Sequence, residues 1–130
     1  MNRKEYCEDL RGMAIKNTHF YRKVLATYSK KMQLVIYKLK NGESLEREEH
    51  MNSVQFIYVE EGSGMAVVGP NAGKKKKSDE DKTYELSPGV CLIIPKKTYH
   101  YIHNDGERDL KMFSIYVPGE FEPNREDINM

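Results

Sequence analysis

The chain has 130 residues, a length that fits one domain with enough residues to bury a core. Its 21 basic and 20 acidic residues give a net charge of +1, so no overall field favours a nucleic acid or an anionic membrane surface. The sequence shows no apolar signal segment near its start and no apolar run of the roughly 20 residues that a membrane span needs. We therefore expect a cytoplasmic protein with neither a nucleic acid nor a membrane as partner.

The first element is predicted to be a short amphipathic helix over residues 3–16. Tyr6, Leu10 and Met13 recur there at helical spacing, with charged residues between them. We assign residues 1–19 to this N-terminal helical segment.

From about residue 20 the pattern changes to strands. Residues 19–29 and 32–43 are rich in β-branched and aromatic side chains, and residues 54–69 predict two strands around a glycine-containing turn. Residues 83–117 add three or four short strands separated by Pro-Gly, Pro and Asp-Gly. Strands at this spacing predict an all-β sandwich or barrel, which we assign to residues 20–117. Residues 118–130 are polar and contain proline, and we expect a loosely docked C-terminal tail.

A charged loop and two cysteines lie within this pattern. The loop Lys74–Lys77 is followed at once by acidic residues, so it is either a phosphate-binding patch or a solvated loop whose charges compensate one another. Blocks of charge between strands are usually exposed, which favours the second interpretation. Cys7 and Cys91 are far apart and form no metal or redox motif, and Cys91 is expected to be buried in an apolar strand.

Two histidines lie three residues apart between residues 95 and 104. Side chains alternate along a strand, so His100, Ile102 and Asn104 share one face while His103 takes the other. We therefore expect His100, and not His103, to face the interior.

A second polar group occurs upstream. His50 and Asn52 are two residues apart and share a face if this segment is extended. Gln55 begins the next strand, whose inner face also carries Ile57. Glu48 shares the face of His50, which makes its carboxylate a candidate supplementary ligand or general base.

These two groups resemble the paired motifs of the cupin superfamily, G-x5-H-x-H-x3,4-E-x6-G and G-x5-P-x-G-x2-H-x3-N. The second motif is matched at the right spacings by Gly89, Pro95, His100 and Asn104, with Lys97 in place of the usual glycine.

The first motif is matched less completely. His50 and Gly62 are in frame, whereas Asn52 stands where the second histidine is expected and Gln55 stands where the glutamate is expected. The match covers residues 32–117, and the chain also resembles the small single-domain cupins described as mannose-6-phosphate-isomerase-like.

The resemblance implies a cupin double-stranded β-helix, a jelly-roll-like antiparallel barrel of six to eight strands behind the short helix. It also implies a homodimer, a small-molecule ligand and a divalent transition metal (Zn, Mn, Fe or Ni) inside the barrel. The implied metal ligands are His50, Gln55, His100 and Asn52. The implied substrate pocket contains Asn104, Ile102 and Ile57.

The missing motif carboxylate leaves the function open. Two imidazoles and two amides bring no negative charge to a divalent cation, whereas three histidines and one glutamate bring one. Either the metal is bound more weakly, or a carboxylate joins from elsewhere, or the pocket has lost its metal. The leading function is metal-dependent isomerisation of a sugar or sugar phosphate. The alternatives are a metal-dependent dioxygenase and a non-catalytic ligand-binding or sensing module.

Overall fold

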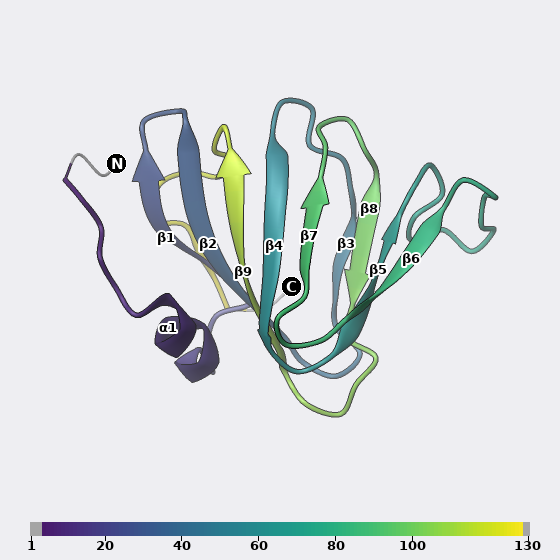
Figure 1. Ribbon diagram of the computed structural model, residues 1–130, viewed down its shortest axis with the longest axis horizontal. Coiled ribbons are helices and arrows are strands. Elements are labelled where there is room, and N and C mark those ends of the chain that lie inside the picture. Colours follow the sequence, from purple (N-terminus) through teal and green to yellow (C-terminus); the bar gives the residue numbers. More distant parts are fainter. Residues whose placement is uncertain (1–3, 129–130) are drawn as a thin grey trace.

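The computed structural model describes residues 4–128, so residues 1–3 of the N-terminal segment and 129–130 of the C-terminal tail lie outside the described residues. Figure 1 shows one short helix followed by strands. The elements are α1 (Leu10–Lys16), β1 (Arg22–Tyr28), β2 (Met32–Leu39), β3 (Ser44–Glu48), β4 (Val54–Glu61), β5 (Gly64–Val68), β6 (Lys82–Leu86), β7 (Cys91–Ile94), β8 (His100–His103), β9 (Leu110–Val117) and β10 (Glu126–Asp127).

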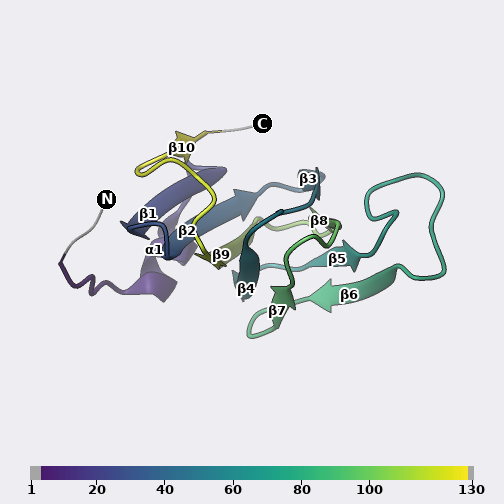
Figure 2. The same cartoon turned by 90° about the horizontal axis from the view of Figure 1, so that it is seen from above.

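The strands form two antiparallel sheets. One has the order β10-β1-β2-β9-β4-β7, and the other has the order β3-β8-β5-β6. Seen from above, the strands of the smaller sheet lie together on the side of the molecule away from α1 (Figure 2). The prediction of an all-β, jelly-roll-like fold with a short N-terminal helix is confirmed.

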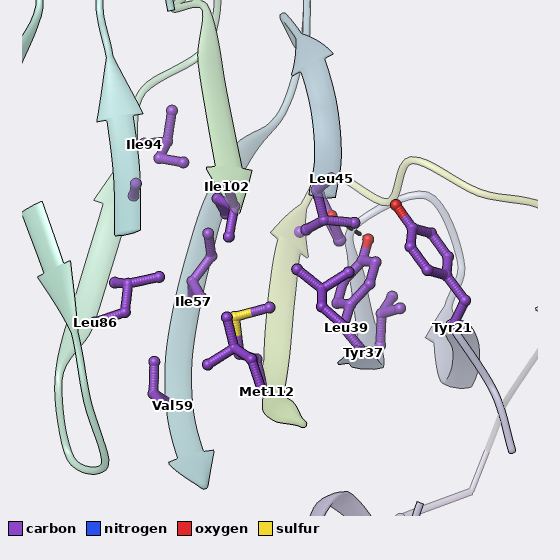
Figure 3. Close-up of a cluster of buried hydrophobic side chains, with 14 of the residues drawn as sticks. Tyr21, Tyr37, Leu39, Leu45, Ile57, Val59, Leu86, Ile94, Ile102 and Met112 are labelled. Atoms are coloured by element: carbon purple, nitrogen blue, oxygen red, sulfur yellow. Dashed lines mark hydrogen bonds between the residues drawn. The ribbon is translucent and has the colours of Figure 1, made fainter. Parts of the chain in front are cut away.

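The core lies between the two sheets. Ile57, Val59 and Met112 of the larger sheet and Leu45 and Ile102 of the smaller one belong to a single buried cluster (Figure 3). Burial follows the alternation that the sequence predicts: in β8, His100 and Ile102 are buried while the residues between and after them are partly exposed. This alternation is what directs His100 into the interior.

The helix is shorter than predicted. It begins at Leu10 because the Asp9 side chain accepts a hydrogen bond from the Gly12 N–H at 3.0 Å and caps it. The prediction of helix is therefore wrong for residues 4–9. The helix packs against β2, β4 and β9, on the outer face of the larger sheet. No helix among residues 4–128 is long and apolar enough to cross a membrane.

The C-terminal segment is fastened to the barrel. Its strand β10 pairs with β1, and Asp127 forms an ion pair of 3.1 Å with Arg22, whose side chain is buried. Phe121 packs against the core cluster. The Gln33 amide accepts hydrogen bonds from the Glu120 and Phe121 N–H groups at 3.1 and 2.9 Å. The expectation of a loosely docked tail is therefore wrong for the described residues, because this polar segment carries the partners of two buried side chains.

The outer faces of β4, β7 and β9 form a continuous apolar surface. Strand β7 is the edge of the larger sheet, and its alternation turns Cys91 and Ile93 outward. Cys91 is exposed, so the prediction that it is buried is wrong. In the register of the sheet, Ile93 lies opposite Phe56. We call this surface the outer apolar face; it consists of Val54, Phe56, Tyr58, Cys91, Ile93, Phe113, Ile115 and Val117.

Candidate metal site

Three potential metal ligands converge at the inner face of the smaller sheet. Ligand atoms of Glu48, His50 and His100 all lie within 4.8 Å of one another. The Nε2 atoms of both imidazoles are 3.4 Å from Oε1 of Glu48. The side chains of His50 and His100 are 6% and 1% exposed, whereas that of Glu48 is 30% exposed. The carboxylate is therefore the member of this group that reaches solvent.

A β-bulge in β3 aims Glu48 at the histidines. Leu45 pairs with Ile102 and Glu48 pairs with His100, so three residue steps on β3 correspond to two steps on β8. The extra residue lets Leu45 and Glu48 share the inner face, which regular alternation does not allow for residues three apart.

The turn before β8 holds the backbone of His50. The Lys97 N–H donates to the carbonyl of His50 at 2.7 Å. Lys97 adopts a left-handed conformation with φ of 61°, at the position where the second motif has glycine. This conformation is strained for a residue with a side chain. The turn therefore keeps the geometry of the motif and loses some stability by doing so.

Contacts at Nδ1 orient both imidazoles. Nδ1 of His100 is 3.1 Å from the carbonyl oxygen of Thr98, and Nδ1 of His50 is 3.2 Å from Oε1 of Glu120. Both partners can only accept, which favours a proton on Nδ1 and leaves a lone pair on Nε2. Neutral imidazole with a free Nε2 is the form that binds a metal.

Gln55, a ligand expected from the sequence, has a buried side chain on the neighbouring sheet. It is fully buried on the inner face of β4, and its Nε2 donates to Oγ of Ser114 at 3.1 Å. In the register of the sheet it lies opposite Tyr116, whose ring is 5.3 Å from that of His50. Within residues 4–128, Oε1 of Gln55 has no hydrogen-bond partner, and neither has Nε2 of His50 or of His100. Buried polar atoms without partners are costly, and a cation fits the two Nε2 atoms together with the Glu48 carboxylate.

Electrostatics make Glu48 a better ligand than base. Burial raises the pKa of its carboxyl, but the contacts with His100 and His50 outweigh burial and lower the pKa to about 2. Burial lowers the pKa of His50, but the contacts with Glu48 and Glu120 raise it by more, so the net change is upward. A carboxylate with so low a pKa is a weak proton acceptor at neutral pH. This disfavours the role of general base considered for Glu48 from the sequence.

The remaining predicted site residues have other surroundings. Asn52 is exposed and lines a cleft of about 500 Å³ beside the C-terminal segment. The Asn104 amide is fully buried and donates to the carbonyl of Leu39 at 2.8 Å. Ile57 and Ile102 fill the hydrophobic core. Sequence reasoning did not find Glu120, because it lies outside both motifs and at no fixed spacing from them.

Comparison with known proteins places these residues in a family context. A family model described as "Cupin domain" matches residues 35–116. An uncharacterised protein of Acanthamoeba polyphaga mimivirus is 34% identical over 124 residues, which cover 95% of this chain and 71% of that protein. The protein YrkC of Bacillus subtilis is 31% identical over 105 residues, which cover 81% of this chain. The matched region spans 53% of the length of YrkC.

Solved structures share the fold. The crystal structure of BH2720 from Bacillus halodurans has a TM-score of 0.85 and 25% identity, covering 96% of this chain and 89% of that one. KdgF from Halomonas sp. has a TM-score of 0.62 and 21% identity, covering 81% and 85%. Oxalate decarboxylase from Bacillus subtilis has a TM-score of 0.60 and 20% identity, covering 72% and 23%. At these identities the last two show a common fold.

The left-handed turn predicts that Lys97→Gly stabilises the protein. Glycine removes the side-chain strain at φ of 61° and keeps the N–H that binds His50. We expect a gain of about 0.5–1 kcal/mol in the free energy of unfolding, measured by urea denaturation. The control is Lys96→Gly, at an exposed neighbour without a left-handed backbone, where we expect a loss of about 0.5–1 kcal/mol. Equal effects of the two substitutions contradict the explanation.

The ionised cluster predicts a pH dependence of stability in metal-free protein. The lowered pKa of Glu48 contributes stability above its unfolded value of 4.5, and this is lost as the pH falls toward 2. The raised pKa of His50 contributes stability below 6.5, and this is lost as the pH rises through the folded value. We expect Glu48→Gln to remove the acid dependence and to weaken, without abolishing, the dependence due to His50, because Glu120 still raises the His50 pKa; urea unfolding with a chelator from pH 3 to 8 measures both. Parallel profiles for wild type and variant refute the assignment.

Proposed function

The chain belongs to the cupin family, and on this premise we propose that it binds a divalent transition metal through Glu48, His50 and His100 and acts on a small polar molecule. The observation that carries the proposal is the convergence of two buried, partnerless Nε2 atoms on one carboxylate. Zn, Mn, Fe and Ni all accept this combination of donors. Gln55 is the proposed fourth donor through its partnerless amide oxygen.

Glu48 supplies the negative charge that the motif positions lack. Two imidazoles and one carboxylate form the donor set typical of non-haem iron oxygenases, in which further coordination positions stay open. A metal bound here supplies Lewis acidity and, if it is redox-active, oxygen chemistry. Because Glu48 is the exposed member of the set, a small molecule approaches from its side. The two histidines are enclosed on their other sides by Glu120, Tyr116 and the strands of the barrel.

Among reaction classes, the donor set favours a metal-dependent dioxygenase. Isomerisation of a sugar or sugar phosphate, as the resemblance to mannose-6-phosphate-isomerase-like cupins suggests, needs a base beside the substrate. Glu48 has a pKa of about 2, and its carboxylate is occupied in binding the cation. A sugar isomerase is the second candidate, supported by the resemblance and by the access from solvent to the site at Glu48.

We further propose a cytoplasmic location without nucleic acid or membrane partners. The net charge of +1 provides no attraction for polyanions, and both cysteines are free and exposed, as in a reducing compartment. Alkylation of the thiols in freshly lysed cells tests this: recovery of Cys7 and Cys91 in an oxidised form contradicts it.

The metal proposal is tested by titrating chelator-treated protein with Zn²⁺ or Mn²⁺ in a calorimeter. We expect one equivalent to bind, and we expect Glu48→Ala and His100→Ala to weaken binding by more than the roughly 10–100-fold lost with an outer-shell partner. The matched control is His103→Ala, on the same strand but the opposite face, which should leave affinity unchanged. Wild type that binds neither ion refutes the proposal.

Two further measurements refine the site. Gln55→Glu should tighten metal binding by adding a charge, and an unchanged affinity removes Gln55 from the ligand set. Metal analysis of protein purified without chelator separates the reaction classes. Iron supports the dioxygenase, whereas zinc or manganese supports the isomerase.

The homodimer is proposed to form through the outer apolar face. Two of its members, Ile93 and Val117, are 60% and 50% exposed, and Ile93 lies on the free edge strand β7. We expect Ile93→Lys to give a monomer in light scattering coupled to size exclusion. Tyr84→Lys, at an exposed apolar residue of the other sheet, should leave a dimer. A monomeric wild type rules this interface out.

A further inference from the structure

His50 lies between two carboxylates that come from distant parts of the chain. Its Nε2 is 3.4 Å from Glu48 of β3, and its Nδ1 is 3.2 Å from Glu120 of the C-terminal segment. The His50 side chain is 6% exposed, so both nitrogens depend on protein groups rather than water. The metal site described above uses Glu48 and leaves Glu120 without a role.

The two histidines of the site obtain their Nδ1 acceptors in different ways. His100 uses the carbonyl of Thr98, two residues before it in the chain. His50 lies in the connection between β3 and β4, and its Nδ1 is reached instead by a side chain 70 positions further on. Oε1 of Glu48 is 3.4 Å from Nε2 of His50 and makes no hydrogen bond with it, whereas Glu120 is 3.2 Å from Nδ1, so the contact with Glu120 favours the imidazole proton on Nδ1.

Glu120 is held in place from both sides. Oε1 of Gln33 accepts hydrogen bonds from the N–H groups of Glu120 and Phe121, and Nε2 of Gln33 donates to the Phe121 carbonyl at 2.7 Å. Gln33 itself is fully buried. On the other side, Oγ of Ser53 donates to the carbonyl of Pro118 at 2.7 Å, which ties the segment to the connection that carries His50. The carboxylate therefore contacts His50 from a backbone that is already fixed.

We propose that Glu120 is a positioning residue of the metal site: by accepting the Nδ1 proton of His50, it directs the Nε2 lone pair toward the cation. The proposal rests on the metal site proposed above. It makes residues 118–127 part of the site, although they lie outside the two motifs. A carboxylate on the far nitrogen also increases the basicity of the ligating one, so Glu120 strengthens metal binding without touching the metal.

The first test needs no metal. ¹⁵N NMR of the imidazole nitrogens, at a pH where His50 is neutral, reports which nitrogen carries the proton. We expect Nδ1–H in the wild type and Nε2–H in Glu120→Ala, since Glu48 is then the remaining acceptor. Glu120→Asp keeps a carboxylate and should restore part of the wild-type signal. Glu122→Gln is the matched control, because Glu122 is an exposed acidic residue of the same segment, and it should change nothing.

The second test is Zn²⁺ affinity of the same variants. We expect Glu120→Ala to weaken binding roughly 10–100-fold, while Glu122→Gln binds as the wild type does. An unchanged tautomer in Glu120→Ala overturns the positioning role, and a changed tautomer with unchanged affinity overturns its link to the metal. Wild type that shows Nδ1–H but binds no Zn²⁺ refutes the metal site and leaves the orientation of His50 supported. Glu120→Leu, which keeps a side chain of similar size without an acceptor, serves if the alanine variant does not fold, with the same expected results.

Discussion

The structure depends on the cost of burying two imidazole Nε2 atoms and an amide oxygen that find no hydrogen-bond partners among residues 4–128. Such groups destabilise a fold unless something compensates for their lost hydration. Here the compensation is one carboxylate, Glu48, placed between the two Nε2 atoms. The attraction between the Glu48 carboxylate and the His50 imidazole contributes both to the low pKa of Glu48 and to the raised pKa of His50.

Local irregularities of the barrel serve this arrangement. The bulge in β3 turns Glu48 inward, and the left-handed Lys97 presents its N–H to the backbone of His50. Both features occur where the β3–β4 connection meets the turn before β8. Each departs from regular strand or turn geometry and is held in place by the surrounding sheet. Such irregularities are common at functional sites. The barrel provides the rigid frame, and the bulge in β3 and the turn at Lys97 set the positions of Glu48 and His50.

Sequence reasoning located part of the site for physical reasons. Strand alternation predicted that His100 faces inward and His103 does not, because residues three positions apart on a strand lie on opposite faces. The spacing of the first motif put His50 and Gln55 at positions that hold metal ligands in the family.

The other parts of the site depend on contacts that no local pattern encodes. The sequence indicated Glu48 as a supplementary ligand from the face it shares with His50, but the bulge that points its side chain at both histidines cannot be read from residues 44–48. Glu120 contacts His50 through tertiary docking of a polar segment that looked like a free tail. The Asp9 side-chain cap makes the helix begin later than the spacing predicts, and Cys91 is exposed on the outer side of an edge strand.

The central claim is that Glu48, His50 and His100 bind one cation together. X-ray absorption spectroscopy of the protein loaded with one equivalent of Zn²⁺ tests it most directly, because the scattering pattern reports the ligand types around the metal. The account predicts two imidazole ligands with the remaining donors oxygen, and the loss of one imidazole in His100→Ala. A spectrum without imidazole scattering, or with sulfur from Cys7 or Cys91, contradicts it.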